Sequence, residues 1–219
     1  MNTTTLLRTV IVSAGLLANS LLQAATYTWT GAVSSDWNNP ANWNPNTGVP
    51  GDGDSAVINS GSPTISEATT AAEISLMGGS LGGSGVLTVT NVMDWTGGTM
   101  GGSGATVIAA GATLNIKGDG QKALDRRSVT VRNLGTVVWS GAGNIFVQNG
   151  APFWNEAGGV FEVQNDAVYQ KDPWSAAGTF YNLGTLRKVG AGGTTTWSGV
   201  GFENGGTVET LSGRFLFPN

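Results

Sequence analysis

The sequence contains no cysteine and no histidine in 219 residues. This excludes disulfide bonds, thiol nucleophiles and imidazole bases, and it removes the usual zinc ligands. Charged residues are also scarce, at 11% against the usual quarter or so. The net charge is −4, whereas a nucleic-acid-binding protein needs a basic surface. We therefore expect no cofactor, no bound metal and no nucleic-acid partner.

Glycine, by contrast, is abundant: it supplies 35 residues, about twice its usual share of roughly 7%. Hydrophobic residues make up 40% of the chain, which is enough for a core. Intrinsic disorder normally combines low hydrophobicity with high net charge, and neither is found here. The length suits one ordinary domain or two small ones.

The N-terminus has the layout of a secretory signal peptide. Arg8 is followed by an apolar run over 9–22, and then by the small residues Ala24 and Ala25. The alternative is a membrane anchor, but the run is shorter than the roughly 20 residues a spanning helix needs. We expect 1–25 to be removed, by cleavage after Ala24 or Ala25, and the protein to be secreted or displayed at the surface of a bacterium.

Two internal repeats follow. The segments 78–89 (GGSLGGSGVLTV) and 97–108 (GGTMGGSGATVI) match at a shift of 19 residues. A looser repeat of 22 to 27 residues runs to the C-terminus, and its anchors are Gly85, Ala112, Gly135, Gly159, Gly184 and Gly206. Repetition at a fixed period is the sequence signature of repeat architectures.

Polarity alternates after each anchor, as in a half-buried strand. The second position is always apolar: Leu87, Leu114, Val137, Phe161, Leu186 and Val208. The third position is mostly polar, and the alignment predicts that Glu162, Arg187 and Glu209 form one outward stack. The fourth is apolar until Lys188 and Thr210.

An asparagine precedes the later anchors, as Asn133, Asn155, Asn182 and Asn204. Asparagine tolerates left-handed backbone angles. We therefore interpret these residues as an Asn-then-Gly turn that recurs once per repeat.

These patterns predict an all-β fold, a right-handed parallel β-helix of about six to seven coils over 61–219. Segment 26–60 differs, because it carries Trp29, Trp37 and Trp43 together with several prolines. Solenoids need an atypical terminal unit, so we interpret 26–60 as an N-terminal cap. A β-sandwich also gives many short strands but needs no repetition in register, and a propeller would repeat at about 40–50 residues.

The segments DWNNPANW (36–43) and GVPGDGDSAVI (48–58), followed by glycine-rich coils with Trp-Ser/Thr-Gly, resemble the opening of large bacterial exported β-helix proteins. That group includes autotransporter passengers and filamentous-haemagglutinin-like adhesins. The resemblance implies a pectin-lyase-like β-helix and a role in surface adhesion or scaffolding.

The candidate contact residues are Trp154 and Trp174, which lie between coils and could stack on sugar rings or fill an interface. The remaining tryptophans before Ser/Thr-Gly (Trp29, Trp95, Trp139 and Trp197) are expected to pack internally. Asp52 and Asp54 are too few for calcium, and we interpret them as a turn of the cap.

A cluster of charged residues between 117 and 132 is expected to be a solvated loop. Its members are Lys117, Asp119, Lys122, Asp125, Arg126, Arg127 and Arg132. Its spacing does not place two carboxylates on one strand face, as glycoside hydrolysis would require.

The sequence thus favours a secreted, non-catalytic protein for adhesion or scaffolding, with host-surface or extracellular glycans or proteins as partners. The alternatives are a carbohydrate-active β-helix enzyme, similar to polysaccharide lyases or hydrolases, and a non-catalytic glycan-binding module.

Overall fold

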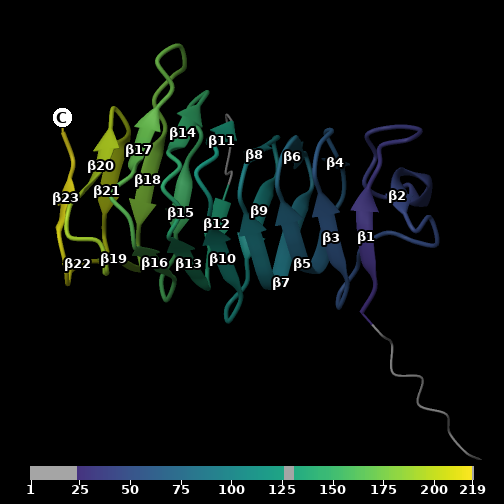
Figure 1. Ribbon diagram of the computed structural model, residues 1–219, viewed down its shortest axis with the longest axis horizontal. Helices are drawn as coiled ribbons and strands as arrows, with labels where there is room; N and C mark the ends of the chain where they lie inside the picture. Colours follow the sequence, from purple (N-terminus) through teal and green to yellow (C-terminus); the bar gives the residue numbers. More distant parts are fainter. Residues whose placement is uncertain (1–23, 126–130, 219) are drawn as a thin grey trace, which may run out of the picture.

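The computed structural model describes residues 24–125 and 131–218. It is a parallel β-solenoid of about seven turns, seen from the side in Figure 1. This confirms the predicted fold class. The signal-peptide prediction for 1–25 lies almost entirely outside the described residues. Among the described residues, no helix is long and apolar enough to cross a membrane.

The turns of the solenoid have three faces, and most turns carry one short strand on each face. Face 3 is an eight-stranded sheet. Its strands are β4 (Thr64–Ile65), β6 (Ser80–Gly83), β8 (Gly98–Gly101), β11 (Lys122–Asp125), β14 (Ile145–Gln148), β17 (Val168–Lys171), β20 (Thr194–Ser198) and β23 (Arg214–Leu216).

Faces 1 and 2 belong to one 15-stranded sheet, because two long strands turn the corner between them. These strands are β5 (Thr69–Leu76) and β7 (Val86–Trp95). Face 1 holds their first halves and then β9 (Ala105–Ile108), β12 (Val131–Asn133), β15 (Phe153–Asn155), β18 (Thr179–Asn182) and β21 (Gly201–Asn204). Face 2 holds β1 (Thr26–Trp29), β3 (Ser55–Ile58), the second halves of β5 and β7, β10 (Thr113–Ile116), β13 (Thr136–Trp139), β16 (Val160–Val163), β19 (Thr185–Lys188) and β22 (Thr207–Thr210).

The 19-residue repeat is confirmed as the pairing of neighbouring coils. Leu81 pairs with Met100 on face 3, and Val86 pairs with Ala105 on face 1. Both steps are 19 residues. The longer repeat is confirmed on face 2, where Thr113, Thr136 and Val160 pair in succession.

The first anchor of the longer repeat was assigned to the wrong face. Gly85 precedes the face 1 half of β7, whereas the face 2 partner of Thr113 is Val92. The two halves of β7 have the same alternation of apolar and polar residues, so the pattern does not distinguish them. The corner itself is marked by two consecutive exposed residues, Thr90 and Asn91, and by a shift of the β5–β7 register.

The second-position residues of face 2 fill the interior as expected. Leu114, Val137, Phe161 and Leu186 are fully buried. In the last coil Val208 is partly exposed. Inside the later coils Phe180 lies against Phe153 with ring centroids 5.1 Å apart and planes at 2°, and Phe161 contacts both rings edge-on.

The asparagines also stack, but the expectation that they adopt left-handed backbone angles was wrong. None of the four has a positive φ; among the described residues, Asn149 is the non-glycine residue that does. Instead, the side-chain amides form a ladder at the corner between faces 1 and 2. Asn133 Nδ2 donates to Asn155 Oδ1 (2.8 Å), and Asn155 Nδ2 donates to Asn182 Oδ1 (2.8 Å).

The anchor glycines Gly184 and Gly206 have no positive φ. The close approach of the backbones of neighbouring coils explains them instead. A Cβ at Gly184 would overlap the carbonyl oxygen of Gly159 in the preceding coil, and a Cβ at Gly206 would overlap that of Gly184. Glycine is therefore needed for contact between coils, since any side chain would separate them.

A tryptophan cluster covers the N-terminal end. Trp43 in β2 (Trp43–Asn44) contacts Trp29 and Trp37 edge-on, at centroid distances of 5.0 and 4.7 Å. Its Nε1 donates to the carbonyl of Trp37 (2.8 Å). The short 3-10 helix Pro40–Asn42 leads into β2, which pairs antiparallel with β1.

Candidate functional site

The predicted outward stack on face 2 is present. Glu162 pairs in register with Arg187, and Arg187 pairs with Glu209. Arg187 Nη2 lies 2.7 Å from Glu162 Oε2, and Nη1 lies 3.7 Å from Glu209 Oε1. Hydrogen bonds from Gln164 and from Arg187 hold the pKa of Glu162 below its usual range. The stack therefore joins three successive coils through Arg187.

Trp154 points outward from β15 on face 1 and is half-buried. Its ring stacks on Tyr181 of the next coil, with centroids 3.9 Å apart and planes at 11°. On the preceding coil Arg132 is its register partner and forms an ion pair with Glu156 (2.7 Å). One ring face of Trp154 is thus already occupied by Tyr181.

Trp174 is 96% exposed. It lies on the loop between β17 and β18, which projects from the solenoid in Figure 1. Asp172 holds the start of this loop, because its Oδ1 accepts a hydrogen bond from the backbone N–H of Trp174 (3.0 Å). The two tryptophans named as contact residues are in different settings, and no ring contact joins them within the described part of the chain.

The charged cluster between 117 and 132 is not a single solvated loop. Lys117 pairs with Asp94 (2.9 Å) at the end of face 2, and Arg132 lies on face 1. Lys122 is fully buried, and its Nζ donates to the carbonyls of Gly118 (3.2 Å) and Gly120 (2.8 Å). Burial lowers the pKa of Lys122. Arg126 and Arg127 lie outside the described residues.

A second buried lysine has a structural role as well. Lys188 occupies the fourth position on face 2, where the other coils place Trp139 or Val163. Its Nζ donates to the backbone carbonyl of Asn165, to Asp166 Oδ1 (2.9 Å) and to Thr195 Oγ1 (2.8 Å). The three N–H groups are all used, so this lysine is part of the core. The only sequence signal was the break in the apolar column.

The remaining tryptophans and Asp54 pack as the sequence led us to expect. Trp95, Trp139 and Trp197 are fully buried, and Trp29 nearly so. Asp54 closes its own turn, because its carboxylate accepts hydrogen bonds from the backbone N–H groups of Ala25 (2.9 Å) and Gly51 (3.1 Å).

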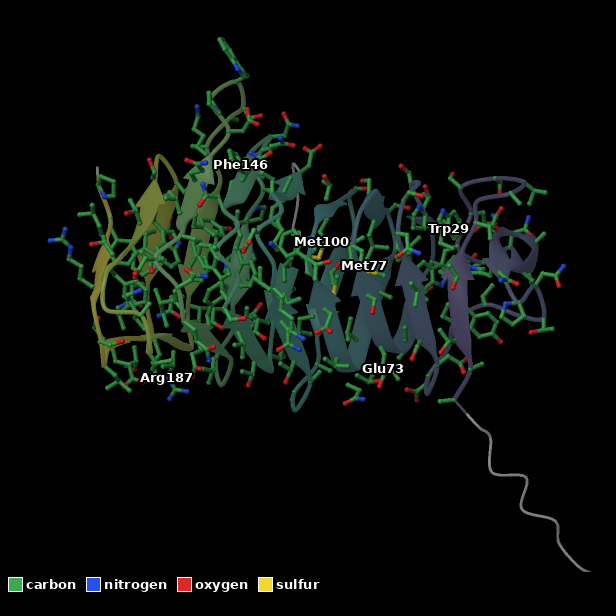
Figure 2. All side chains as sticks on the ribbon, in the orientation of Figure 1. Trp29, Glu73, Met77, Met100, Phe146 and Arg187 are labelled. Carbon is green, nitrogen blue, oxygen red and sulfur yellow. The ribbon has the colours of Figure 1, made fainter. Side chains whose placement is uncertain are left out.

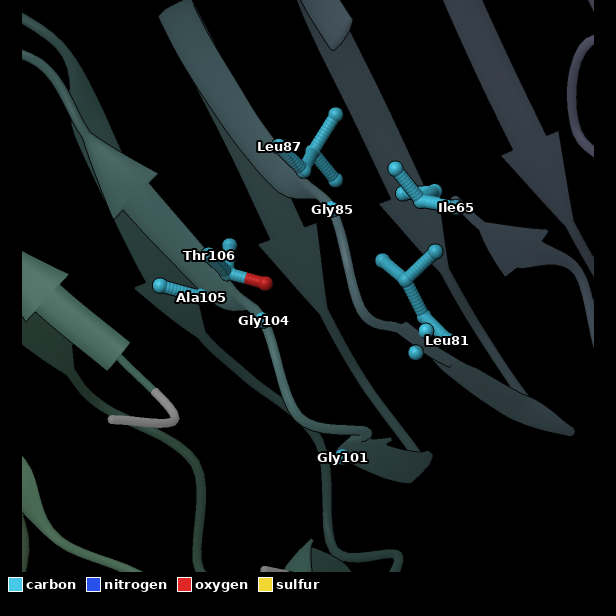
Figure 3. Close-up of a pocket in the computed structure, with 10 residues that line it drawn as sticks. Ile65, Leu81, Gly85, Leu87, Gly101, Gly104, Ala105 and Thr106 are labelled. Atoms are coloured by element: carbon cyan, nitrogen blue, oxygen red, sulfur yellow. The ribbon is translucent and has the colours of Figure 1, made fainter. Parts of the chain in front are cut away.

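Several hollows occur in the described structure, and three of them are large or well formed enough to compare. The first, shown in Figure 3, is a gap of about 10 Å³ inside the glycine-rich coils, beside Leu81 and Leu87. It is too small for any ligand but water. The second, of about 480 Å³, is formed by Phe202, Phe217 and neighbouring residues beside the last coil.

The third hollow measures about 260 Å³ and lies on face 3. It is lined by Gly98, Thr99, Gln121, Lys122, Ala123, Phe146, Gln148 and Asp172. Sequence reasoning missed it, because it depends on which side chains of different coils become neighbours. Only an alignment of the face 3 strands in their pairing register brings its lining residues together.

Comparisons with protein-family models, with curated proteins and with solved structures find no match for this chain.

Proposed function

We propose that this chain is an exported, non-catalytic β-solenoid that serves adhesion or scaffolding at the bacterial cell surface. The observation that carries the proposal is Trp174, which is almost wholly exposed on a loop held by Asp172. Tryptophan is among the residues most enriched at the energetic centres of interfaces. A large aromatic side chain presented on a rigid support suits contact with a partner.

The ion pairs of four carboxylates favour a non-catalytic role over a carbohydrate-active enzyme. Asp94, Glu156, Glu162 and Asp166 each form an ion pair with a lysine or an arginine. Glycoside hydrolysis needs two carboxyl groups that face each other across the scissile bond and are free to exchange protons. Paired carboxylates are better suited to joining coils.

Export and contact are tested together by expressing the full chain in a Gram-negative host. We expect the exported product to begin at Ala25 or Thr26 on N-terminal sequencing. Beads coated with this product should be retained on a mucin film, and Trp174→Ala should abolish most of that retention. Leu211→Ala is the matched control, since Leu211 is also exposed but lies near the last coil. An intact Met1 on a cytosolic product, or equal retention of Trp174→Ala, would contradict the proposal.

A further inference from the structure

The hollow on face 3 arises from a step in side-chain size along one outward row. Thr99, Ala123 and Phe146 are register partners on β8, β11 and β14. The first two are small, whereas the third is a large ring, so Phe146 forms a wall beside a floor made by Ala123 and the backbone. Phe146 lies at the same edge of the solenoid as the projecting loop in Figure 2, and Arg187 lies at the opposite edge.

Polar groups surround this aromatic wall. Gln121, Gln148, Thr99 and Asp172 are among the residues that line the hollow. Gln148 Nε2 donates to Asp172 Oδ2 (2.9 Å), which leaves the Gln148 amide oxygen able to accept from a ligand. These groups suit a ligand that carries both hydroxyl donors and acceptors.

Asp172 connects the hollow to Trp174. One of its oxygens accepts from Gln148 within the hollow, and the other accepts from the backbone N–H of Trp174. The exposed indole is therefore attached, two residues along the chain, to a residue that lines the hollow. The hydrogen bond from its backbone N–H to Asp172 holds the start of the loop, and the indole itself is not among the residues that line the hollow.

We propose that the face 3 hollow, with Phe146 as its wall, binds one or two sugar rings of a neutral glycan. The assignment rests on the proposed function and names its ligand class. Aromatic rings pack against the apolar faces of sugars, and amides and carboxylates bind their hydroxyls. The volume of about 260 Å³ lies just below the roughly 300–1,000 Å³ of ordinary ligand pockets, which limits the ligand to one or two rings.

Charge and topology favour a neutral glycan over an acidic one and over a peptide. Hydrogen bonds from Gln148 and from the Trp174 backbone lower the pKa of Asp172, so its carboxylate stays ionised and would repel an acidic sugar. The Lys122 ammonium is directed at backbone carbonyls. The β11 and β14 strands are paired on both sides, so a peptide could not bind there as an added strand.

Isothermal titration calorimetry of the full chain with cellotetraose, xylotetraose, mannotetraose and trigalacturonate tests the assignment. We expect saturable binding of at least one neutral oligosaccharide and weaker binding of trigalacturonate. Phe146→Ala should weaken the affinity about ten-fold through loss of the aromatic wall. Ala123→Leu should also weaken it, because it fills the hollow without removing a contact group. Trp154→Ala, which removes an aromatic ring from face 1, should leave it unchanged.

The results distinguish a failure of the glycan assignment from a failure of the proposed adhesive function. The assignment is overturned if no neutral oligosaccharide binds, if trigalacturonate binds best, or if Phe146→Ala and Ala123→Leu bind as tightly as the parent chain. In each case, bead retention that still depends on Trp174 would leave the adhesive function intact. If each variant unfolds at the same temperature as the parent chain, a loss of binding is not caused by a loss of fold.

Discussion

Replacement of Phe161 by alanine is expected to lower the free energy of unfolding by about 3–5 kcal/mol. Phe161 is fully buried and contacts Phe153 and Phe180 edge-on, at 5.2 Å from each ring centroid. The shorter side chain would leave a cavity, and the coils on both sides could not close it without breaking their pairing. The shift of the urea unfolding midpoint, followed by circular dichroism, measures the loss.

The matched control is Thr136→Ala on the same face. Thr136 is the first residue of its strand and is only half-buried, so its replacement should cost well under about 1 kcal/mol. Equal losses in the two variants would show that the second position does not face the interior.

Replacement of Asn155 by alanine should cost a similar amount, about 3–5 kcal/mol, although it removes a polar side chain. Asn155 accepts from Asn133 Nδ2 and donates to Asn182 Oδ1 and to the carbonyl of Thr185 (3.1 Å). The variant leaves the amides of Asn133 and Asn182 without these partners inside the fold, and a buried group left unsatisfied costs about 1–3 kcal/mol. Urea unfolding again measures the effect.

Asn204→Ala is the control within the same ladder. Asn204 occupies the last rung and is exposed, so water can replace its bond to Asn182. Its loss should be much smaller than that of Asn155→Ala. If both variants are equally stable, the amide ladder does not stabilise the solenoid.

The periodic features of the fold were predictable because each repeats a local rule. The 19-residue match required glycine pairs in both copies, and these form the close contacts between coils around Gly83 and Gly102. The apolar second position repeats because every coil must fill the same interior. The stack of Glu162, Arg187 and Glu209 followed from the same alignment.

Features that arise between coils were harder to predict. The asparagines suggested a turn, since a sequence shows each residue beside its chain neighbours and not beside the same residue of the next coil. Lys122 was expected in a solvated loop and Lys188 only interrupted an apolar column, but backbone carbonyls accept their N–H groups in the interior. The hollow on face 3 depends on Ala123 and Phe146 being neighbours, which no local pattern reveals.

The two candidate tryptophans illustrate the same limit for function. The sequence identified Trp154 and Trp174 by their place between coils, but it did not show that Trp154 stacks on Tyr181. Only Trp174 is left almost fully exposed, and the residues that connect it to a hollow, Asp172 and Gln148, have no distinctive motif.

The central claim is that each coil stacks on the next in one fixed register, and paired cysteines test it most directly. The chain has no cysteine of its own. Thr136 and Val160 are register partners on adjacent coils, whereas Thr113 and Val160 are two coils apart. Adjacent strands lie about 4.8 Å apart, and a disulfide requires Cα atoms within about 7 Å. We predict that Thr136→Cys with Val160→Cys forms a disulfide on oxidation and that Thr113→Cys with Val160→Cys does not; the reverse result, or equal yields, would contradict the register.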